Sequence, residues 1–369
     1  MGDHFRPIHV VRDCDQRLIQ PGEPICAGSA INSRKTTGGS MGIELGDEAT
    51  IEKYAASDAE DLLGEAAGLA WLGEAEATGG LRAASVVSAS KTRLVEKRIT
   101  TEYAPTASDA RAAGAALART HAAGAPWLGC PPPEWEAALA ADTTGHTPAV
   151  YVVHGASTPV VPRDDAPSNW GAFFAEWRVM PFVRALIDSR ELSFDDASPL
   201  LRVCDRLASG DFDAPQPALV ERAIADSQAR AAAAADMTDT AGATGGTGLA
   251  NTTTTTCVAP LPPVTCARLH GDLWAGNLLW DAAPTNAARA TLIDPMAHGG
   301  HAETDLAMLR LFGCDRLDDL IRGYDEASPL ADGWRDRVGL HQLAPLLLHC
   351  VIYGGYFLGE TLRVATRYI

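Results

Sequence analysis

The sequence predicts an α+β fold in which a small sheet precedes a larger, mainly helical region. Short runs typical of strands occur early, at Thr50–Tyr54, Ser85–Ala89 and Arg93–Ile99. After Ile99, most long segments instead carry apolar residues at helical spacing. The length of 369 residues is enough for one large domain or two lobes with a buried core.

The composition is typical of a soluble globular protein. Hydrophobic residues make up 46% of the chain and charged residues 21%. The net charge of −17 argues against a surface for nucleic acid or anionic membrane, either of which needs clustered Lys and Arg. No run reaches the ~20 apolar residues that span a bilayer. We therefore expect neither nucleic-acid nor membrane partners, and the oligomeric state is left open.

The cysteines and the first residues favour a cytoplasmic location. None of the eight cysteines forms a C-x-x-C pair, which indicates buried thiols in a reducing compartment more than a disulfide frame or a zinc site. The initial M-G-D-H-F-R-P lacks the apolar core of a secretory signal. We expect a cytoplasmic protein.

One helix is expected between the first two strands. It covers Asp58–Ala77, with Ser57 or Asp58 as its cap and leucines and alanines at helical spacing. Lys53 lies on the first strand, and Glu65 lies twelve residues later on this helix. Taken alone, such charges are usually solvated.

A weaker signal precedes these elements, in the run G-E-P-I-C-A-G-S-A-I-N-S at Gly22–Ser33. Gly28 and Ser29 could bring backbone N–H groups close to a phosphate. An ordinary surface turn fits the same residues equally well. Both interpretations stay open.

Helices dominate the remainder of the chain. Ser108–His121 has a Ser cap and a Gly stop, and Asn169–Asp188 is amphipathic. Residues 125–167 are rich in Pro, Gly and Thr, so we expect loop there with one short helix near Trp135. Further helices are expected at Glu303–Leu311, Leu317–Tyr324, Trp334–His349 and Val351–Arg367.

A low-complexity stretch interrupts this pattern at about 231–259. It contains the alanine run Ala231–Ala235, a Gly- and Thr-rich segment and the threonine run Thr252–Thr256. Such a composition has little apolar surface to bury, so we expect a disordered, mobile surface insertion. Its cost in stability should be small, because closure entropy grows only logarithmically with loop length.

The most informative stretch runs from His270 to Asp294. It reads H-G-D-L-W-A-G-N-L-L-W-D, then a polar turn, then T-L-I-D-P. The pattern predicts a loop, a strand, a hairpin turn and a second strand that ends at Asp294. This hairpin would return Asp294 to the neighbourhood of Asp272 and Asn277.

Two carboxylates and an amide at one place suit a magnesium–nucleotide site. Mg²⁺ prefers oxygen ligands, so Asn277 and Asp294 could hold it, while Asp272 accepts a proton from an attacking hydroxyl. The spacing H-x-D-x-x-x-x-N followed by a later Asp matches the phosphoryl-transfer pattern of kinases. The plainer alternative is that these residues are loop-capping acids beside two strands.

These residues and the segment that follows resemble a known family. H-G-D-L-W-A-G-N, I-D-P and H-x-x-H-x-E-T-D-L-A-M-L-x-L-F-G (His298–Gly313) are similar to the fructosamine (ketosamine) kinase family. That family is a branch of the protein-kinase-like and aminoglycoside-phosphotransferase superfamily. The motif H-G-D indicates only the superfamily, whereas the L-W-x-G-N extension is more specific. The resemblance covers most of residues 50–365, apart from the insertion.

The resemblance implies a two-lobed protein-kinase-like fold with ATP between the lobes. Residues 1–99 would form the nucleotide-binding lobe, ending at the hinge, and residues 100–369 the catalytic and acceptor lobe. Lys53, paired with Glu65, would position the phosphates, and Gly28 and Ser29 would lie in the hairpin that covers them.

The hinge and the catalytic loop have counterparts in the same family. Lys97, Arg98 and Ile99 would hold adenine through their backbone groups, although Lys97 stands where the family usually has Glu. Asp305 would cap or anchor the catalytic loop.

The implied activity is that of an ATP:ketosamine 3-phosphotransferase with Mg²⁺ as cofactor. Such enzymes phosphorylate the sugar 3-hydroxyl of fructosamine or ribulosamine adducts, on small molecules or proteins. The 3-phosphate is unstable and leaves, so the outcome is deglycation, a form of protein repair.

Two alternatives stay open. The same motif frame serves aminoglycoside- and choline-type hydroxyl kinases. A nucleotide-binding pseudokinase without turnover is a further possibility, indicated by the altered hinge and the weak glycine loop, but the presence of Lys53, Asp272, Asn277 and Asp294 together argues against it.

Other polar residues are expected to be structural. His298 and His301 suggest a metal, but without a third nearby ligand a structural role is favoured. His121 is expected to pack or end a helix rather than act as a base. Trp170 and Arg178 could border the acceptor cleft, although packing is favoured for the aromatic residue.

Overall fold

The computed structural model describes residues 42–45, 49–57, 60–101, 103–141, 150–153, 156–242, 262–282 and 288–369. Gly28 and Ser29, the expected phosphate-loop residues, lie outside these ranges.

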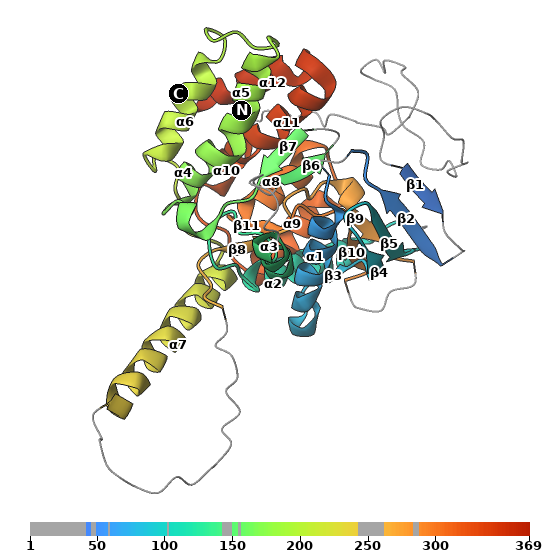
Figure 1. Ribbon diagram of the computed structural model, residues 1–369, viewed down its shortest axis with the longest axis vertical. Helices are drawn as coiled ribbons and strands as arrows, with labels where there is room; N and C mark the ends of the chain where they lie inside the picture. The colour runs from blue at the N-terminus through green and yellow to red at the C-terminus, as the bar shows by residue number, and fades with distance from the viewer. Residues whose placement is uncertain are drawn as a thin grey trace, which may run out of the picture.

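The N-terminal part is organised around a four-stranded antiparallel sheet (Figure 1). Its strands follow the order β1 (Gly42–Leu45), β2 (Thr50–Tyr54), β5 (Arg93–Lys97) and β4 (Val86–Ala89). The predicted strand at Thr50–Tyr54 is therefore confirmed. Figure 1 shows this sheet at one side of the molecule, with most helices on the other.

The helix beside this sheet begins later than the sequence suggested. α1 covers Leu62–Gly73 and continues into the 3₁₀ turn η1 (Glu74–Thr78). Its cap is Asp61, whose carboxylate accepts from the Leu63 N–H at 3.0 Å, so the expected cap at Ser57 or Asp58 is wrong. Asp61 directly precedes the apolar run of the helix and reaches an N–H that would otherwise lack a partner.

A short strand joins the two parts of the chain. β3 (Arg82–Ala83) pairs in parallel with β10 (Ala290–Leu292), which pairs antiparallel with β9 (Leu278–Trp280). The Arg82 guanidinium also forms an ion pair with Asp281 at 2.5 Å. One apolar cluster extends across this connection and includes Leu72 of α1 and Leu292 of β10.

The remaining chain is mainly helical. Its helices are α2 (Ala107–Ala122), α3 (Pro133–Ala141), α4 (Trp170–Phe174), α5 (Met180–Asp188), α6 (Ser198–Ala208), α7 (Ala218–Gly242), α8 (Glu303–Leu311), α9 (Leu317–Ala327), α10 (Trp334–His341), α11 (Leu343–Tyr353) and α12 (Leu358–Ala365). Two further strand pairs are β6 (Val150–Val153) with β7 (Ala156–Pro159), and β8 (Ala267–Leu269) with β11 (His298–Gly300). The β6–β7 hairpin lies in a segment that the sequence predicted as loop.

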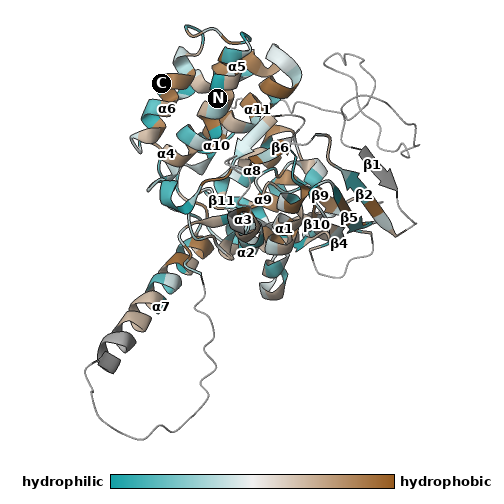
Figure 2. Ribbon diagram, in the orientation of Figure 1, coloured by the Kyte–Doolittle hydropathy of each residue, from teal (hydrophilic) through white to brown (hydrophobic). Residues whose placement is uncertain are grey.

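A second apolar core lies among the helices α4, α5, α6, α8, α11 and α12. α6 contributes Leu200, Val203, Cys204 and Leu207, which share one helical face. Figure 2 shows hydrophilic and hydrophobic residues alternating along this helix. Between α4 and α5 the predicted Asn169–Asp188 helix contains a π-helical segment, Ala175–Val179.

α7 differs from the expected insertion. The structure continues this helix to Gly242, so residues 231–242 are helical, and residues 243–261 lie outside the described part. Alanine has the highest helix propensity, which explains how the run Ala231–Ala235 extends a helix even though it is exposed. Figure 1 shows α7 projecting from the body of the molecule.

The stretch Trp334–Tyr368 contains a window with a mean hydropathy of 1.3. By length and composition alone the stretch is long and apolar enough to cross a membrane. The structure divides it into α10, α11, α12 and short 3₁₀ turns, with a break at Gly354, where φ is +70°. Its residues contribute to the second core, and core helices of soluble proteins pass the same test.

Candidate active site

The predicted catalytic hairpin is present. After β8 the chain forms a loop from His270, the 3₁₀ turn η4 (Ala275–Asn277) and then β9, which pairs antiparallel with β10. Leu278 lies opposite Leu292 in this pair. Asn277, just before β9, and Asp294, shortly after β10, are thereby brought to the same end of the hairpin.

The three expected oxygen-bearing residues meet at this end. Asn277 is 2% exposed, and its Nδ2 donates to the Asp272 carbonyl at 2.8 Å and to the Asp272 carboxylate at 3.2 Å. The same amide donates to the Asp294 carbonyl at 3.5 Å. Asp272, Asn277 and Asp294 therefore lie together, as the hairpin pattern predicted, while their catalytic and metal roles stay predictions.

Two backbone conformations shape this site. Gly271 has φ of +84°, and a Cβ there would lie 2.2 Å from the Met296 carbonyl oxygen, so glycine is required between His270 and Asp272. Asp294 has φ of +52°, a left-handed conformation that Asp tolerates better than most residues. This conformation comes two residues after the end of β10, where the chain leaves the strand.

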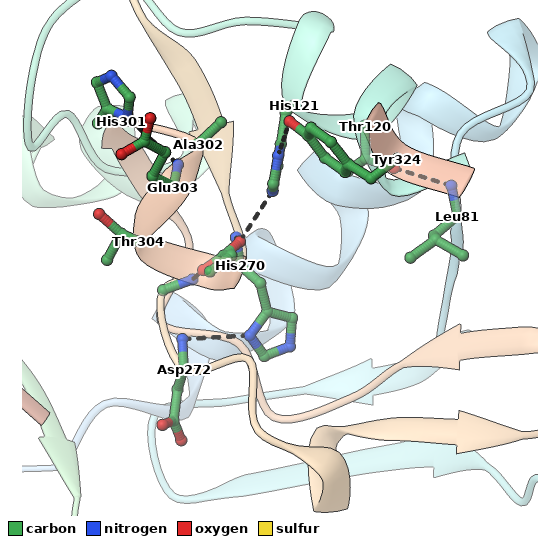
Figure 3. A network of polar contacts seen from close by, with 12 residues as sticks. Leu81, Thr120, His121, His270, Asp272, His301, Ala302, Glu303, Thr304 and Tyr324 are labelled. Carbon is green, nitrogen blue, oxygen red and sulfur yellow. Dashed lines mark hydrogen bonds and ion pairs between the residues drawn. The ribbon is translucent and has the colours of Figure 1, made fainter. Parts of the chain in front are cut away.

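Asp305, on α8, holds the start of the catalytic loop. Its two carboxylate oxygens accept from the backbone N–H groups of His270 at 2.7 Å and Gly271 at 3.0 Å, which confirms the predicted anchoring role. His121 Nε2 donates to the same carboxylate at 3.2 Å, and His121 Nδ1 lies 2.8 Å from the Tyr324 hydroxyl. Figure 3 shows His121 between Tyr324 and this loop.

The pKa of Asp305 reflects these contacts. Burial alone would raise it, but the hydrogen bonds and charges from His121 and His270 hold the pKa of Asp305 below its usual range. An ionised carboxylate is a stronger acceptor for backbone N–H groups than a neutral acid. Asp305 thereby fixes the loop on α8.

His270 itself is buried and structural. Its Nε2 donates to the Ile293 carbonyl at 2.8 Å, and its Nδ1 accepts from the Asp272 N–H at 3.2 Å. Burial lowers the pKa of His270, which favours the neutral ring that these two contacts require. The ring joins the loop to the end of β10, and Figure 3 shows the Asp272 carboxylate directed away from it.

Lys53 is the centre of a buried charge cluster. Its Nζ lies 2.5 Å from Glu65 Oε1 and 2.8 Å from Glu96 Oε2, and it also forms an ion pair with Asp294 Oδ1. The expected Lys53–Glu65 pair is therefore present. The contact with Asp294 connects β2 and α1 of the smaller lobe to the catalytic hairpin of the larger one.

The charges in this cluster and its burial shift the pKa values of Lys53, Glu65 and Glu96. Burial alone would lower the pKa of Lys53, but the charges of Glu65, Asp294 and Glu96 outweigh it and raise this pKa. Burial raises the pKa of Glu65 to about 8, with Lys53 opposing the shift and the other two carboxylates adding to it. The pKa of Glu96 is raised as well, mainly by burial.

The sequence pattern does not identify Glu96 as a member of this cluster. Its side chain is 5% exposed, and its Oε1 has no hydrogen-bond partner among the described residues. The signal lay in the strand alternation: Leu94 lies opposite Lys53 in the β2–β5 pair, and Glu96, two residues on, points to the same face. Because Glu96 stands beside Lys97 near the end of the strand, the sequence favours an exposed position for it.

The structure limits how the expected adenine residues could act. The Lys97 N–H donates to the Ser85 carbonyl and the Arg98 N–H to the Ala49 carbonyl, each at 2.9 Å. Ile99 is partly buried against the first core. A backbone contact between adenine and Lys97 or Arg98 would therefore use their carbonyl oxygens, and the assignment of these three residues stays a prediction.

The residues at this site fit a magnesium ion chemically. Asn277 and Asp294 offer hard oxygen donors, and the Asp294 side chain is 26% exposed, so it can face an ion on the solvent side. Glu65, Glu96 and Asp294 bring carboxylate oxygens within 4.8 Å of one another, although Lys53 lies among them. The magnesium assignment stays a prediction.

The two histidines of the H-x-x-H run diverge. His298 Nδ1 donates to the Met296 carbonyl at 2.7 Å, and burial lowers the pKa of His298 to about 3. His301 instead lies near Glu303 and His341, a group whose ligand atoms fall within 4.8 Å. The Glu303 carboxylate is already bound by Arg337 at 2.6 and 2.9 Å, which gives that group a structural explanation.

Trp170 and Arg178 are both buried, as packing residues are. The Trp170 ring packs against His341 in a tilted arrangement, with ring centroids 4.3 Å apart. Arg178 donates to the carbonyls of Pro159 and Trp177 at 2.9 Å, and burial lowers the pKa of this guanidinium to about 9. A role at the acceptor cleft stays open for Arg178.

Comparison with known proteins agrees with this geometry. A model of the fructosamine kinase family matches residues 243–369. A protein of Enterococcus faecium named a probable ketoamine kinase is 37% identical over 91 residues, which are 25% of this chain and 31% of that protein. A Klebsiella pneumoniae protein with the same kind of name is 37% identical over 91 residues, 24% of this chain and 68% of that one. The match thus spans less than a third of the first relative and about two thirds of the second.

The likeness in three dimensions covers more of the chain. The crystal structure of a Thermobifida fusca protein assigned as a fructosamine-3-kinase has a TM-score of 0.60 and 28% identity, covering 86% of this chain and 85% of that one. The fold is the two-lobed, kinase-like α+β fold that the sequence predicts. This chain belongs to the fructosamine kinase family.

Proposed function

We propose that this protein is an ATP-dependent ketoamine kinase that phosphorylates the 3-hydroxyl of fructosamine or ribulosamine adducts and so promotes deglycation. The acceptor would be a small ketoamine or one attached to a protein, in a reducing cytoplasm. The observation that carries the proposal is the meeting of Asp272, Asn277 and Asp294 with Lys53 at one place, built from both lobes.

Asp272 would act on the acceptor. Its carboxylate accepts from Asn277 at 3.2 Å and sits on a loop that Asp305 fixes from the other side. A carboxylate held this way can orient the 3-hydroxyl and take its proton as the oxygen attacks the γ-phosphorus. One O–P bond then forms to the sugar and one breaks to ADP, and the proton resides on Asp272.

The Lys53 cluster would align the nucleotide. Phosphoryl transfer depends mainly on positioning and charge neutralisation, so Lys53, held by Glu65 and Glu96, would fix the phosphates in line with the acceptor. Asn277 and Asp294 would hold Mg²⁺, which when bound supplies neutralisation of phosphate charge. Asp294 also reaches Lys53, so a single side chain connects the metal and phosphate positions.

The test is transfer from ATP to defined acceptors. The purified full chain would be incubated with ATP, Mg²⁺ and either fructoselysine or ribuloselysine, and ADP release would be measured with phosphate incorporation at the sugar. We expect ketoamine-dependent ADP release and a product phosphorylated at the 3-hydroxyl. Absence of transfer to every ketoamine would reject the substrate assignment.

Two other outcomes would select the alternatives. Transfer to kanamycin or choline but not to ketoamines would identify a hydroxyl kinase of another specificity on the same fold. A rise in melting temperature with ATP, without turnover of any acceptor, would identify a pseudokinase. The three carboxylates around Lys53 would repel the phosphates of ATP, which is a structural reason to test for this second outcome.

A further inference from the structure

A concave site apart from the catalytic hairpin lies in the larger lobe. Its cavity volume is about 600 Å³, within the range of roughly 300–1,000 Å³ that is typical of small-molecule sites. The residues that line it come from the loop after α6, the end of α8, α10 and the 3₁₀ turn η6 (Thr366–Tyr368). These elements are distinct from the catalytic loop, the β9–β10 hairpin and the Lys53 cluster.

The lining of the cavity is positively charged, whereas the chain as a whole is negative. Among the described residues that line it, four are arginines and one is an acid: Arg310, Arg335, Arg337, Arg367 and Asp336. The whole chain has a net charge of −17, so this concentration of guanidinium groups is unusual for its surface. Guanidinium groups recognise oxyanions by charge-assisted, paired hydrogen bonds. The cavity is therefore suited to an anion.

Two of the guanidinium groups are available to a ligand. Arg310 pairs at 3.9 Å with Asp318, whose side chain is 92% exposed, a contact that water screens strongly. Arg335 stacks on the Trp334 ring at 4.5 Å, and no carboxylate in the described part of the chain pairs with it. Arg337 differs, because Glu303 holds it at 2.6 and 2.9 Å as a fixed part of the wall.

A buried amide side chain also belongs to the lining of the cavity. Gln342 is 1% exposed and lines the site, and its Nε2 donates to the Ala307 carbonyl at 2.9 Å. Its Oε1 has no hydrogen-bond partner among the described residues. Buried polar atoms are rarely left unpaired, so this oxygen is a candidate acceptor for a ligand hydroxyl.

We infer that this cavity binds a small polyhydroxylated phosphate monoester. The phosphate would lie between Arg310 and Arg335, and a hydroxyl would donate to Gln342 Oε1. Phosphate is favoured over carboxylate because three oxygens carrying nearly two charges can engage two separate guanidinium groups at once. Phe212 and Tyr368 add aromatic surface to the wall, against which a sugar ring can pack.

The experiment is calorimetric titration of the full chain with fructose 6-phosphate as the probe. We expect saturable binding to one site, weakened by roughly tenfold or more in the Arg310→Ala/Arg335→Ala double variant. Both side chains are at least partly exposed, so the double variant should keep the melting temperature of the wild type. Arg184→Ala, an exposed arginine on α5, is the matched control and should bind the probe normally.

A second variant tests the proposed hydrogen bond from a ligand hydroxyl to Gln342. Gln342→Leu removes the acceptor at similar volume, so it should weaken fructose 6-phosphate severalfold and leave inorganic phosphate unchanged. Inorganic phosphate binding as tightly as the sugar phosphate would mean an adventitious ion only. Absence of saturable binding, tighter binding of citrate, or equal binding by the double variant would each overturn the inference, the last because the probe would then occupy another site.

Discussion

Asp272 presents its carboxylate from a loop that is fixed on both sides. Asp305 holds the backbone before it through the N–H groups of His270 and Gly271, and Asn277 holds the residue itself through two hydrogen bonds. A group held in this way loses little entropy when a substrate arrives, which is the main contribution that positioning makes to catalysis.

We expect Asp272→Asn to lower kcat by about 10²–10⁴-fold, the usual range for loss of a positioned acid–base group. Asn keeps the shape and can still occupy the place beside Asn277, so the melting temperature and the KM for ATP should change little. Steady-state kinetics with a ketoamine acceptor measure the effect. Asp318→Asn, at a 92% exposed position, is the control. Wild-type turnover in Asp272→Asn would show that Asp272 takes no part in the reaction.

We expect Glu65 to make the stability of the folded protein depend on pH. Its pKa rises from 4.5 to about 8 on folding, so between these pH values the folded chain retains a proton that the unfolded chain has lost. The stability contributed by this proton is therefore complete below pH 4.5 and is lost as the pH rises through 8. Glu65→Gln is neutral throughout and should lack this dependence.

The measurement is the free energy of unfolding in urea at pH 5 and pH 8, for the wild type and Glu65→Gln. The wild type should lose stability relative to the variant between the two pH values. Comparing the two proteins cancels the titration of other groups, such as the buried His298. A difference that is independent of pH would show that Glu65 is ionised in the folded chain.

Residue spacing predicted part of this site but not all of it. Asp272, Asn277 and Asp294 follow a motif with fixed spacing, and Lys53 and Glu65 sit on elements whose periodicity is clear. Glu96 could not be assigned, because only the pairing of β2 with β5 places it beside Lys53. The backbone N–H groups of Lys97 and Arg98 were also beyond prediction, since their partners, Ser85 and Ala49, are set by tertiary structure.

At the scale of elements, α2 and α9 form an unusually close contact. A Cβ on Gly114 of α2 would lie 1.9 Å from the Leu320 carbonyl oxygen of α9. A Cβ on Gly323 of α9 would lie 2.1 Å from the Arg111 carbonyl oxygen. The two helices therefore approach backbone to backbone, and this contact carries His121 and Tyr324 to the carboxylate of Asp305.

We expect Gly114→Ala to destabilise the protein by about 1–3 kcal/mol or more, because the backbone of α9 cannot yield as a flexible side chain would. Gly359→Ala on α12 is the matched control, since nothing lies within 4 Å of a Cβ there. The control should be neutral or more stable, as alanine favours helix. Denaturant unfolding compares the two variants. Equal stabilities would contradict the close helix contact.

Helices and the catalytic hairpin were predictable because their periodic patterns are local. The end of α7 was not, since the low complexity of Ala231–Ala235 indicated disorder while its propensity favours helix. The π-helical segment and the β6–β7 hairpin also escaped prediction. Both depend on packing against distant elements, which a local pattern does not contain.

For the whole molecule, the structure makes the two lobes interdependent. Leu72 and Ala83, before the expected boundary at Ile99, share one apolar cluster with Leu278 and Leu292 after it. β3 also pairs with β10 across that boundary. A lobe separated at residue 99 would expose part of this cluster and lose the strand pair.

We therefore expect the full chain to unfold in one cooperative transition. Scanning calorimetry should give a single peak whose calorimetric and van't Hoff enthalpies agree. A fragment of residues 1–99 should lack a folded circular-dichroism signal by itself, because it cannot complete the shared cluster. Two separate calorimetric peaks, or a stable isolated fragment, would show independent lobes.

The surroundings of Lys53 bear on how a nucleotide first approaches. One ammonium group faces three carboxylates, and an excess of negative charge persists even when Glu65 is protonated. A bare triphosphate would meet repulsion there, whereas one escorted by a divalent cation would not. Binding of the nucleotide should therefore already depend on the divalent cation, before any phosphoryl transfer takes place.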